Sequence, residues 1–437
     1  MIIPPPSSLS LRATSSLKNT SNALWDVLID LWHPQTNPNG YVSLGLADNT
    51  VMQEQLLRRM NSGSFSAPCL ALGDTIAGSI RLRTAIAHLL NRHLHPSKPL
   101  QPSQIITTNG VTSAIEHCSW AVCDPGEGIL LGRPYYRGFT RDLCLRPATK
   151  IVPVSFGDLD PLSVSAVARY EEAVIRSRDQ GCAIRSLMLC NPHNPLGRCY
   201  SRPFLVELMR MCQKFGIHLI SDEIYALAVW RRGQDEETPM EPFTSLLSIN
   251  TEGIIDPSLV HVLWGVSKDF GANGARLGVV ISQGNPDLLE SIRGVGQFSS
   301  ISGFADSLIT TVLEDEEFVD RYVHENRAKL AELYAYVVKF LDDHGIPYAR
   351  GSNAAFFVWC DLLTPYMKAR PSSVTDESDA ARAGNKELMA KLASHKVHLG
   401  NGDDFVHEQP GWFRITFSQH REHIDEGLRR IVQVIQG

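Results

Sequence analysis

The 437-residue sequence has no CxxC pair among its nine cysteines, no long apolar run and no block of basic residues. The cysteines are scattered and odd in number, which argues against a disulfide framework and against a zinc site built on cysteine. No stretch approaches the roughly 18 apolar residues that a membrane-spanning helix needs, so no membrane partner is expected. Because this cysteine usage fits a reducing compartment, we expect a cytoplasmic protein.

Residues 1–24 also lack the apolar segment of a secretory signal. They contain no acidic residue, and their Ser/Thr content together with Arg12 and Lys18 also fits a transit peptide. A plain N-terminal arm is the simpler interpretation, and we prefer it.

The charge balance excludes a strong positive field that would attract a polyanion. Lysine and arginine number 41 against 47 acidic residues, which gives a net charge of -6, and no basic-aromatic interleaving occurs. We therefore expect no nucleic-acid partner and a small-molecule substrate. His93 and His95 have no third ligand nearby in the sequence, so no metal site is predicted.

What the sequence does contain, from residue 104 on, is an alternation of short apolar runs with helical stretches. The apolar runs are 105–106, 129–131, 151–154, 187–190, 217–220, 260–264 and 277–281, and the helical stretches include 112–122, 161–177 and 201–214. Strands that alternate with helices in this way form a mainly parallel sheet covered on both faces. The pattern predicts an α/β fold with a mainly parallel seven-stranded sheet between helices.

Beyond residue 300 the pattern changes. The expected elements are a long amphipathic helix at 314–343, strands at 356–359 and 412–417, and a closing helix at 423–435. The segment 368–385 shows no apolar face, and we predict a surface excursion there. The predicted organisation is an N-terminal arm and helix at 1–45, a large α/β domain at 46–300 and a smaller α+β domain at 301–437.

Chemistry-bearing residues follow three of the apolar runs, at the strand ends where open α/β sheets bind ligands. Two Asn-Pro pairs fall within residues 191–197, which predicts a rigid loop that holds an amide side chain in place. Asp222 ends the next run, and Tyr225 lies three residues later. Lys268 follows the run 260–264, with Arg276 eight residues further on.

These strand ends lie within a set of motifs that resembles a known family. The motifs are GLADN (45–49), PYYRGF (134–139), NPHNPLG (191–197), SDEIY (221–225), SKDFGANGARLG (267–278) and QPGWFR (409–414). In this order they resemble the fold-type I pyridoxal-phosphate enzymes of the class I/II aminotransferase family, in the branch similar to 1-aminocyclopropane-1-carboxylate (ACC) synthase. The resemblance covers about residues 22–430 and implies pyridoxal 5'-phosphate as cofactor and a homodimer with shared active sites.

The resemblance also implies a role for individual residues. Lys268 would attach the cofactor covalently through its amine and then move protons at the substrate's Cα. Asp222 would pair with the pyridine nitrogen and keep it protonated. Asn194 and Tyr225 would hydrogen-bond the 3' oxygen of the ring, and Tyr136 would stack on the ring.

The phosphate and the substrate need positive charge and donors. Val111, Thr112 and Ser113 lie between a predicted strand and a predicted helix, where a helix N-terminus binds anions. By resemblance, Arg276 would add a charge-assisted clamp on the phosphate. Arg414 matches the family arginine that binds the α-carboxylate of an amino acid. The remaining substrate-binding positions that the resemblance implies are Ala47 and Asn194.

The sequence departs from the family pattern at three places. Gly265 stands where the family usually has a phosphate-binding serine, and Leu72, Gly73 and Asp74 stand where many relatives have a tyrosine that reaches the neighbouring subunit. Asp48 is one methylene shorter than the glutamate of plant ACC synthases. These departures count against tight phosphate binding and against strict ACC synthase activity.

Three functions remain open from the sequence. The first is an aminotransferase-like or ACC-synthase-like enzyme that acts at the Cα of an amino acid or an amino-acid conjugate, in fungal secondary metabolism. The second is a carbon–sulfur lyase that releases a thiol from a cysteine conjugate, as in pathways to epidithiodiketopiperazine toxins. The third is a degenerate member of the family that serves as a binding protein, which the retention of Lys268, Asp222 and Arg414 disfavours.

Overall fold

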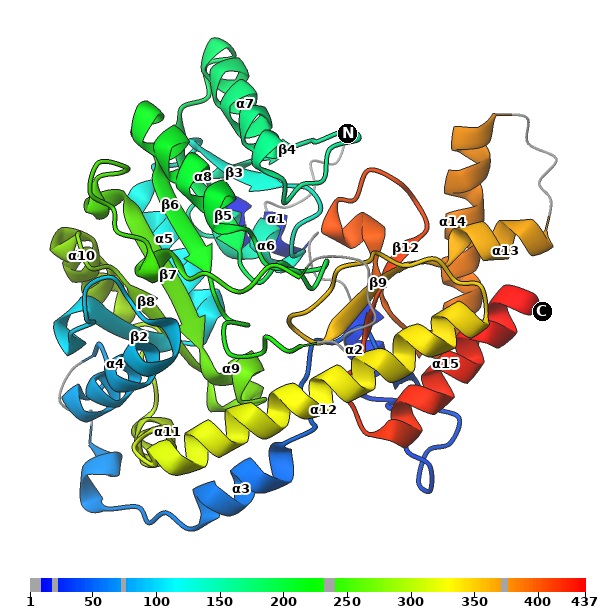
Figure 1. Cartoon of the computed structure of the whole chain (residues 1–437), viewed down its shortest axis with the longest axis horizontal. Coiled ribbons are helices and arrows are strands. Elements are labelled where there is room, and N and C mark those ends of the chain that lie inside the picture. The colour runs from blue at the N-terminus through cyan, green and yellow to red at the C-terminus, as the bar shows by residue number, and fades with distance from the viewer. Residues whose placement is uncertain (1–8, 18–22, 72–75, 232–239, 371–375) are drawn as a thin grey trace, which may run out of the picture.

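A seven-stranded sheet forms the centre of the structure, a computed structural model that describes residues 9–17, 23–71, 76–231, 240–370 and 376–437 (Figure 1). Its strands are β2 (Ile105–Asn109), β3 (Gly128–Gly132), β4 (Lys150–Val154), β5 (Ile184–Cys190), β6 (His218–Asp222), β7 (Val260–Gly265) and β8 (Leu277–Ile281). The strand order is β2-β8-β7-β6-β5-β3-β4, and β8 alone runs opposite in direction to the other six strands. The predicted mainly parallel sheet is confirmed.

Helices cover both faces of this sheet. Alternate residues of one strand enter two different apolar cores: Leu219 packs in one core, and its neighbour Ile220 packs in the other. The first core includes α4 (Ile80–Leu94), α7 (Val167–Asp179) and α8 (Arg202–Phe215), and the second includes α5 (Val111–Val122), α6 (Gly138–Cys144) and α10 (Pro286–Gly296). Burial on both faces explains why the strands read as continuous apolar runs.

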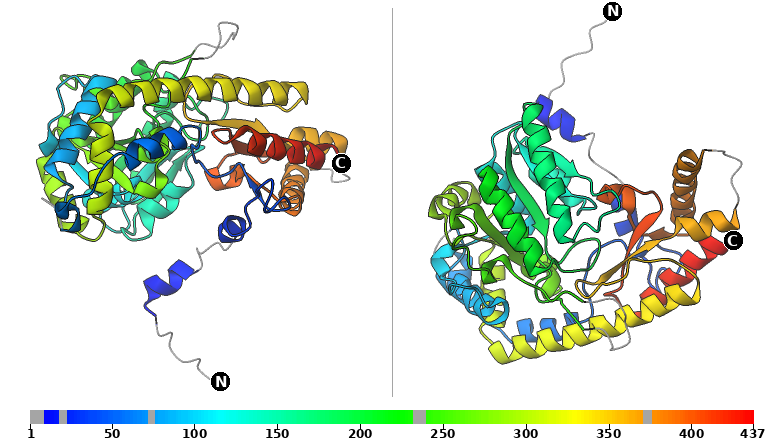
Figure 2. Two further views of the ribbon diagram at one scale, coloured as in Figure 1. Left: turned by 90° about the horizontal axis from the view of Figure 1, so that it is seen from below. Right: turned by 45° about the horizontal axis from the view of Figure 1, so that its top comes forward.

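A second, three-stranded sheet of order β11-β12-β9 is built from β9 (Phe357–Asp361), β11 (Gly400–Asn401) and β12 (Trp412–Thr416). Its helices are α13 (Leu363–Ala369), α14 (Glu377–Ser394) and α15 (Arg421–Gln436). The 28-residue helix α12 (Glu316–Asp343) runs along one side of the molecule from the large sheet to the small one (Figure 2). The long helix predicted at 314–343 is therefore confirmed.

One sequence prediction in this region was wrong. The segment 368–385 was expected to be a surface excursion, but α14 begins at Glu377 and Asp376 caps it by accepting hydrogen bonds from the amides of Ser378 and Asp379. The buried apolar residues of α14, Leu388 and Leu392, lie beyond residue 385. The segment alone therefore showed only the polar start of a longer amphipathic helix.

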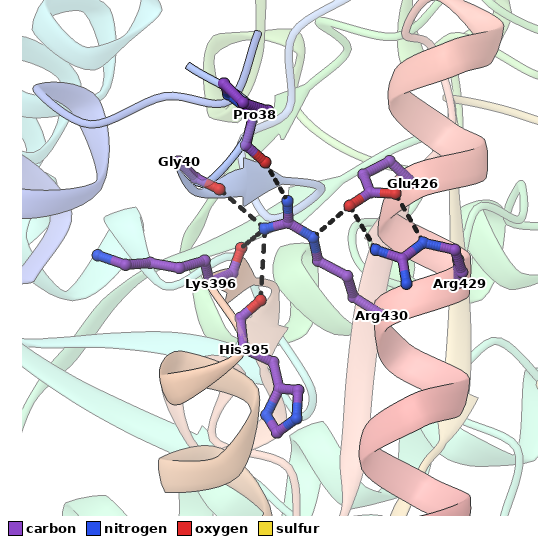
Figure 3. A network of polar contacts seen from close by, with 7 residues as sticks. All are labelled: Pro38, Gly40, His395, Lys396, Glu426, Arg429 and Arg430. Carbon is purple, nitrogen blue, oxygen red and sulfur yellow. Dashed lines mark hydrogen bonds and ion pairs between the residues drawn. The ribbon is translucent and has the colours of Figure 1, made fainter. Parts of the chain in front are cut away.

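The chain from residue 23 to 61 includes α2 (Ala23–Leu28), β1 (Val42–Ser43) and α3 (Gln53–Asn61). Strand β1 pairs in parallel with β10 (Val397–His398), so the N-terminal segment is joined to the C-terminal part of the chain. The guanidinium of Arg430 donates hydrogen bonds to the carbonyl oxygens of Pro38 and Gly40, at 2.9 and 2.8 Å, and to Glu426 at 2.6 Å (Figure 3). This buried arginine fixes the backbone that leads into the GLADN motif.

The division of the chain into an arm, a large domain and a small domain stays a prediction. The seven-stranded sheet lies within residues 46–300, and the three-stranded sheet lies within 301–437. Leu72, Gly73 and Asp74 fall outside the described residues. In the described ranges, no helix combines the length and the apolar character that crossing a bilayer requires.

Candidate active site

A cavity of about 310 Å³ opens at the carboxyl ends of β5, β6 and β7. Cys190, Asp222 and Gly265 end these three strands, and the parallel register places Cys190 directly beside Asp222. The cavity also receives residues from the N-terminus of α5, from the GLADN segment and from β12. It lies where the strand topology predicts a ligand site.

Nearly all of the site residues predicted from the sequence line this one cavity. They are Ala47, Val111, Thr112, Tyr136, Asn194, Asp222, Tyr225, Lys268, Arg276 and Arg414. The exception is Ser113, whose hydroxyl donates to the carbonyl of Asn109 at 3.2 Å and whose amide donates to Gly110. Its donors therefore serve the first turn of α5 and not the cavity.

Several lining residues were not singled out from the sequence, among them Arg137, Cys190, Ser267 and Asn273. Arg137 follows Tyr136 within PYYRGF, and Asn273 lies between Lys268 and Arg276 in a motif already identified. Membership in these motifs was therefore the sequence signal that could have identified Arg137 and Asn273 as site residues. Their direction toward the cavity depends on loop geometry that sequence spacing does not reveal.

Lys268 lies in α9 (Val266–Asp269), the short helix that follows β7. Its Nζ donates to the carbonyl oxygen of Ala47 at 2.5 Å and to Oδ1 of Asn273 at 3.4 Å. Burial lowers the pKa of this amine to about 8, although the nearby carboxylate of Asp48 opposes the shift. A lysine with such a pKa is partly neutral near pH 7 to 8, which makes it a competent nucleophile and base.

Asp222 is buried at the end of β6 and faces the cavity. Its Oδ1 accepts a hydrogen bond from the amide of Ile224 at 3.3 Å. Burial raises the pKa of this carboxyl to about 7, and the charge of Asp142 adds to the shift. A buried carboxylate with so little compensation favours a cationic group in the cavity beside it.

The cavity wall also contains groups that suit an anion. Helix α5 begins at Val111, so the amides of Val111 and Thr112 have no acceptor within the helix, and both residues line the cavity. Gly110 precedes them with φ of 78°, and a Cβ at this glycine would lie 2.4 Å from Nη2 of Arg276. The glycine therefore lets the Arg276 guanidinium approach the helix N-terminus, where both attract an anion.

Arg414 provides a second, buried cation. Its Nη1 donates to Oδ1 of Asn194 at 2.9 Å, and its Nη2 donates to the carbonyl oxygen of Gly45 at 2.7 Å. The guanidinium carbon lies 5.0 Å from the ring centres of both Phe357 and Phe405. These contacts fix the plane of the guanidinium, as the binding of a carboxylate through two hydrogen bonds requires.

Tyr136 and Tyr225 form the aromatic part of the wall. The ring of Tyr136 covers Gly138, where a Cβ would lie 2.3 Å from the ring. Tyr225 packs edge-on against Phe356 and Phe357. Burial raises the pKa of both phenols, so each keeps its proton and has a hydrogen to donate.

The donor set fits pyridoxal phosphate, the cofactor that the sequence motifs imply. The helix N-terminus with Arg276 suits a phosphate, the uncompensated carboxylate of Asp222 suits a protonated ring nitrogen, and the amine of Lys268 suits an aldehyde. Because Gly110 has no side chain, the guanidinium of Arg276 lies close to the start of α5, and its charge suits a phosphate there.

Comparisons with known proteins agree with this geometry. The model for "Aminotransferase class I and II" matches residues 49–431. "Probable aminotransferase gliI" of Aspergillus fumigatus is 33% identical over 405 residues, which are 90% of this chain and 89% of that protein. "1-Aminocyclopropane-1-carboxylate synthase 6" of rice, Oryza sativa subsp. japonica, is 29% identical over 412 residues, 90% of this chain and 72% of that protein.

Among solved structures, a single mutant of Thermus thermophilus aspartate aminotransferase superposes with a TM-score of 0.72 at 20% identity, over 98% of this chain and 99% of that one. At this identity the likeness concerns the fold, which is that of the fold-type I enzymes. The family match and the fungal relative extend over most of the chain. The chain belongs to the class I and II aminotransferase family, whose members depend on pyridoxal phosphate.

Proposed function

We propose that this protein is a pyridoxal-phosphate enzyme that removes the Cα proton of an α-amino acid or of a conjugate that retains the amino-acid group. One observation carries the proposal: the amine of Lys268, the carboxylate of Asp222 and the guanidinium of Arg414 line the same cavity. The lowered pKa of Lys268 suits removal of the Cα proton, and the buried carboxyl of Asp222 suits the ring nitrogen of the cofactor. The oriented guanidinium of Arg414 suits the α-carboxylate.

The cofactor's protonated ring would accept the electrons that remain at Cα when its proton leaves. Asp222 would hold that ring through its nitrogen, Asn194 and Tyr225 would donate to the 3' oxygen, and Tyr136 would lie against the ring face. Arg276, Val111 and Thr112 would bind the phosphate. All of these residues line the cavity.

Arg414 would bind the α-carboxylate, for which Asn194 and Gly45 orient its guanidinium. A substrate held in this way presents its Cα toward the interior of the cavity. Lys268 would accept the Cα proton there, because its amine is partly neutral near pH 8. The carbonyl of Ala47 accepts a hydrogen bond from the same amine and orients it.

Within this chemistry we favour an aminotransferase-like or ACC-synthase-like reaction in fungal secondary metabolism. The similarity to the Aspergillus fumigatus protein "Probable aminotransferase gliI" and to rice ACC synthase supports this choice. Release of a thiol from a cysteine conjugate begins with the same proton removal. The products therefore discriminate between the two reactions.

The deciding experiment incubates the holoenzyme with a panel of amino acids and cysteine conjugates and identifies the products. Keto acid together with pyridoxamine phosphate supports transfer, ACC supports cyclisation, and thiol with pyruvate and ammonia supports the lyase. Lys268→Ala is the control: it should lose the visible absorbance of lysine-bound cofactor and the exchange of the Cα proton with solvent. A wild-type protein without that absorbance would contradict the proposal.

We also propose a homodimer. An exposed apolar patch includes Phe65 and Phe304, whose rings pack edge-on with centres 5.0 Å apart, and Leu70, which is 77% exposed. Both Phe65 and Leu70 belong to the segment that contacts α11 (Gly303–Leu313), the helix that contains Phe304. Exposed large apolar side chains that gather in this way are typical of subunit interfaces.

A further inference from the structure

Arg137 is a cation of the cavity wall that the proposed chemistry does not use. The charged residues that line the cavity are Asp48, Arg137, Asp222, Lys268, Arg276 and Arg414. In the proposed function, Arg276 meets the phosphate, Arg414 meets the α-carboxylate and Lys268 meets the cofactor. Arg137 meets neither the cofactor nor the α-carboxylate in that proposal.

The backbone holds Arg137 at the mouth of the cavity. It immediately precedes α6 and follows Tyr136, and the amide of Tyr135 donates to the carbonyl of Phe405 at 3.0 Å. Its side chain is 39% exposed, so it faces both the cavity and solvent. Asp222, Asn194 and Arg414, which would hold the cofactor and the α-carboxylate, are by contrast buried.

The guanidinium of Arg137 has donors to spare. Nη1 donates to Oδ2 of Asp404 at 3.1 Å, and this single contact uses one of its five N–H groups. Burial lowers the pKa of Arg414 and of His398, and the positive charge of Arg137 adds to both shifts, so this charge also acts within the buried site. Arg137 is thus placed to attract an anion that enters the cavity.

A purely structural role for Arg137 is the competing explanation. Asp404 belongs to the short 3-10 helix Gly402–Phe405, so the Arg137–Asp404 pair joins the loop before α6 to the C-terminal part of the chain. Arg133 and Glu408 form a second such pair nearby, at 3.5 Å. Arg133 does not line the main cavity, which makes it a matched control.

We propose that Arg137 binds a second carboxylate of the substrate, at the end of the side chain remote from Cα. The substrate class is therefore an α-amino acid whose side chain carries an acidic group that reaches the mouth of the cavity. This inference rests on the proposed function, since it assumes that Arg414 binds the α-carboxylate. Asp404 limits the gain, because its own carboxylate competes for Arg137.

Pairs of amino acids matched in length test this subsite. L-glutamate, L-2-aminoadipate and L-2-aminopimelate are compared with L-norvaline, L-norleucine and L-2-aminoheptanoate, and binding to the holoenzyme is measured by calorimetry and by the change in cofactor absorbance. At least one acidic member should bind about tenfold more tightly than its neutral partner, as one charge-assisted contact provides. Arg137→Gln should remove this preference and leave the neutral amino acids unaffected.

Two further variants decide whether Arg137 binds the substrate or only joins two segments of the chain through its ion pair with Asp404. Asp404→Asn should increase the preference for the acidic members, because it removes the competing carboxylate, whereas Arg133→Gln should leave the preference unchanged. If Arg137→Gln and Asp404→Asn weaken the binding of acidic and neutral amino acids alike, the ion pair has only a structural role and the proposal is overturned. Equal binding within every pair of the wild type overturns it as well.

The outcome is distinguishable from failure of the proposed function. A holoenzyme that shows the cofactor absorbance and binds amino acids without regard to a distal charge contradicts only the role of Arg137. A protein that shows no cofactor absorbance contradicts the proposed function itself.

Discussion

Val111 fills the space that a side chain at position 265 would need. A Cβ built on Gly265 would lie 2.8 Å from Cγ2 of Val111 and 2.6 Å from the carbonyl oxygen of Leu277. Both separations are shorter than carbon and oxygen atoms tolerate without movement. Gly265 is therefore matched to its neighbours: position 265, where the family pattern predicts a phosphate-binding serine, has no room for that side chain unless Val111 or Leu277 moves.

Gly265→Ser should destabilise the protein and weaken the binding of pyridoxal phosphate, because the new side chain displaces Val111 at the first turn of α5. Overpacking of this kind costs about 1–3 kcal/mol. Urea unfolding gives the stability, and a cofactor titration gives the affinity. Combining it with Val111→Ala should recover part of the loss, since Leu277 still limits the space. Strictly additive effects of the two substitutions would show that Val111 is not the obstacle.

Arg414→Lys should lower kcat/KM about 100-fold for every amino-acid substrate, acidic or neutral. Lysine keeps the charge but loses the planar guanidinium that Asn194 and Gly45 orient, together with one of two charge-assisted hydrogen bonds to the α-carboxylate. Steady-state kinetics provide the measurement, and Arg421→Lys on the surface is the matched control. A loss restricted to acidic substrates would instead assign Arg414 to the side chain.

The sequence was sufficient for the large sheet and for most of the cavity wall. Strands buried on both faces are continuous apolar runs, and parallel order brings their carboxyl ends together, so Asp222 and Lys268 were expected to meet. The relation of Gly265 to Val111 was not predictable, because the two residues are 154 positions apart and meet only through packing. Arg137 was visible within its motif, but its position at the cavity mouth depends on the contact between Tyr135 and Phe405.

Asp222→Asn should change how the stability of the cofactor-free protein depends on pH. The pKa of Asp222 is about 7 in the folded chain against 3.8 for an ordinary aspartate, so the folded chain binds more protons between these values. Wild-type stability should therefore fall as pH rises from about 4 to 7, by up to about 4 kcal/mol from this group. The asparagine variant lacks this contribution.

The difference in unfolding free energy between Asp222→Asn and the wild type, measured in urea at several pH values, isolates that contribution. Glu223 and Asp269 also have pKa values raised to about 7 by burial. Asp269 is present in both proteins and cancels in the difference, whereas the charge of Asp222 also raises the pKa of Glu223, so the difference includes this coupling. The difference should grow from pH 4 to 7 and stay constant above. A difference independent of pH would mean that Asp222 keeps an ordinary pKa.

Phe304→Asp should shift the protein toward monomers. Phe304 is 45% exposed and packs against Phe65, so an aspartate is tolerated in the folded chain but places a charge in the proposed interface. The dimer dissociation constant, measured by sedimentation, should rise at least about tenfold. Ile175→Asp is the control, because Ile175 is 47% exposed and lies on α7, away from this patch. Equal effects of the two substitutions, or a monomeric wild type, would contradict an interface at Phe304.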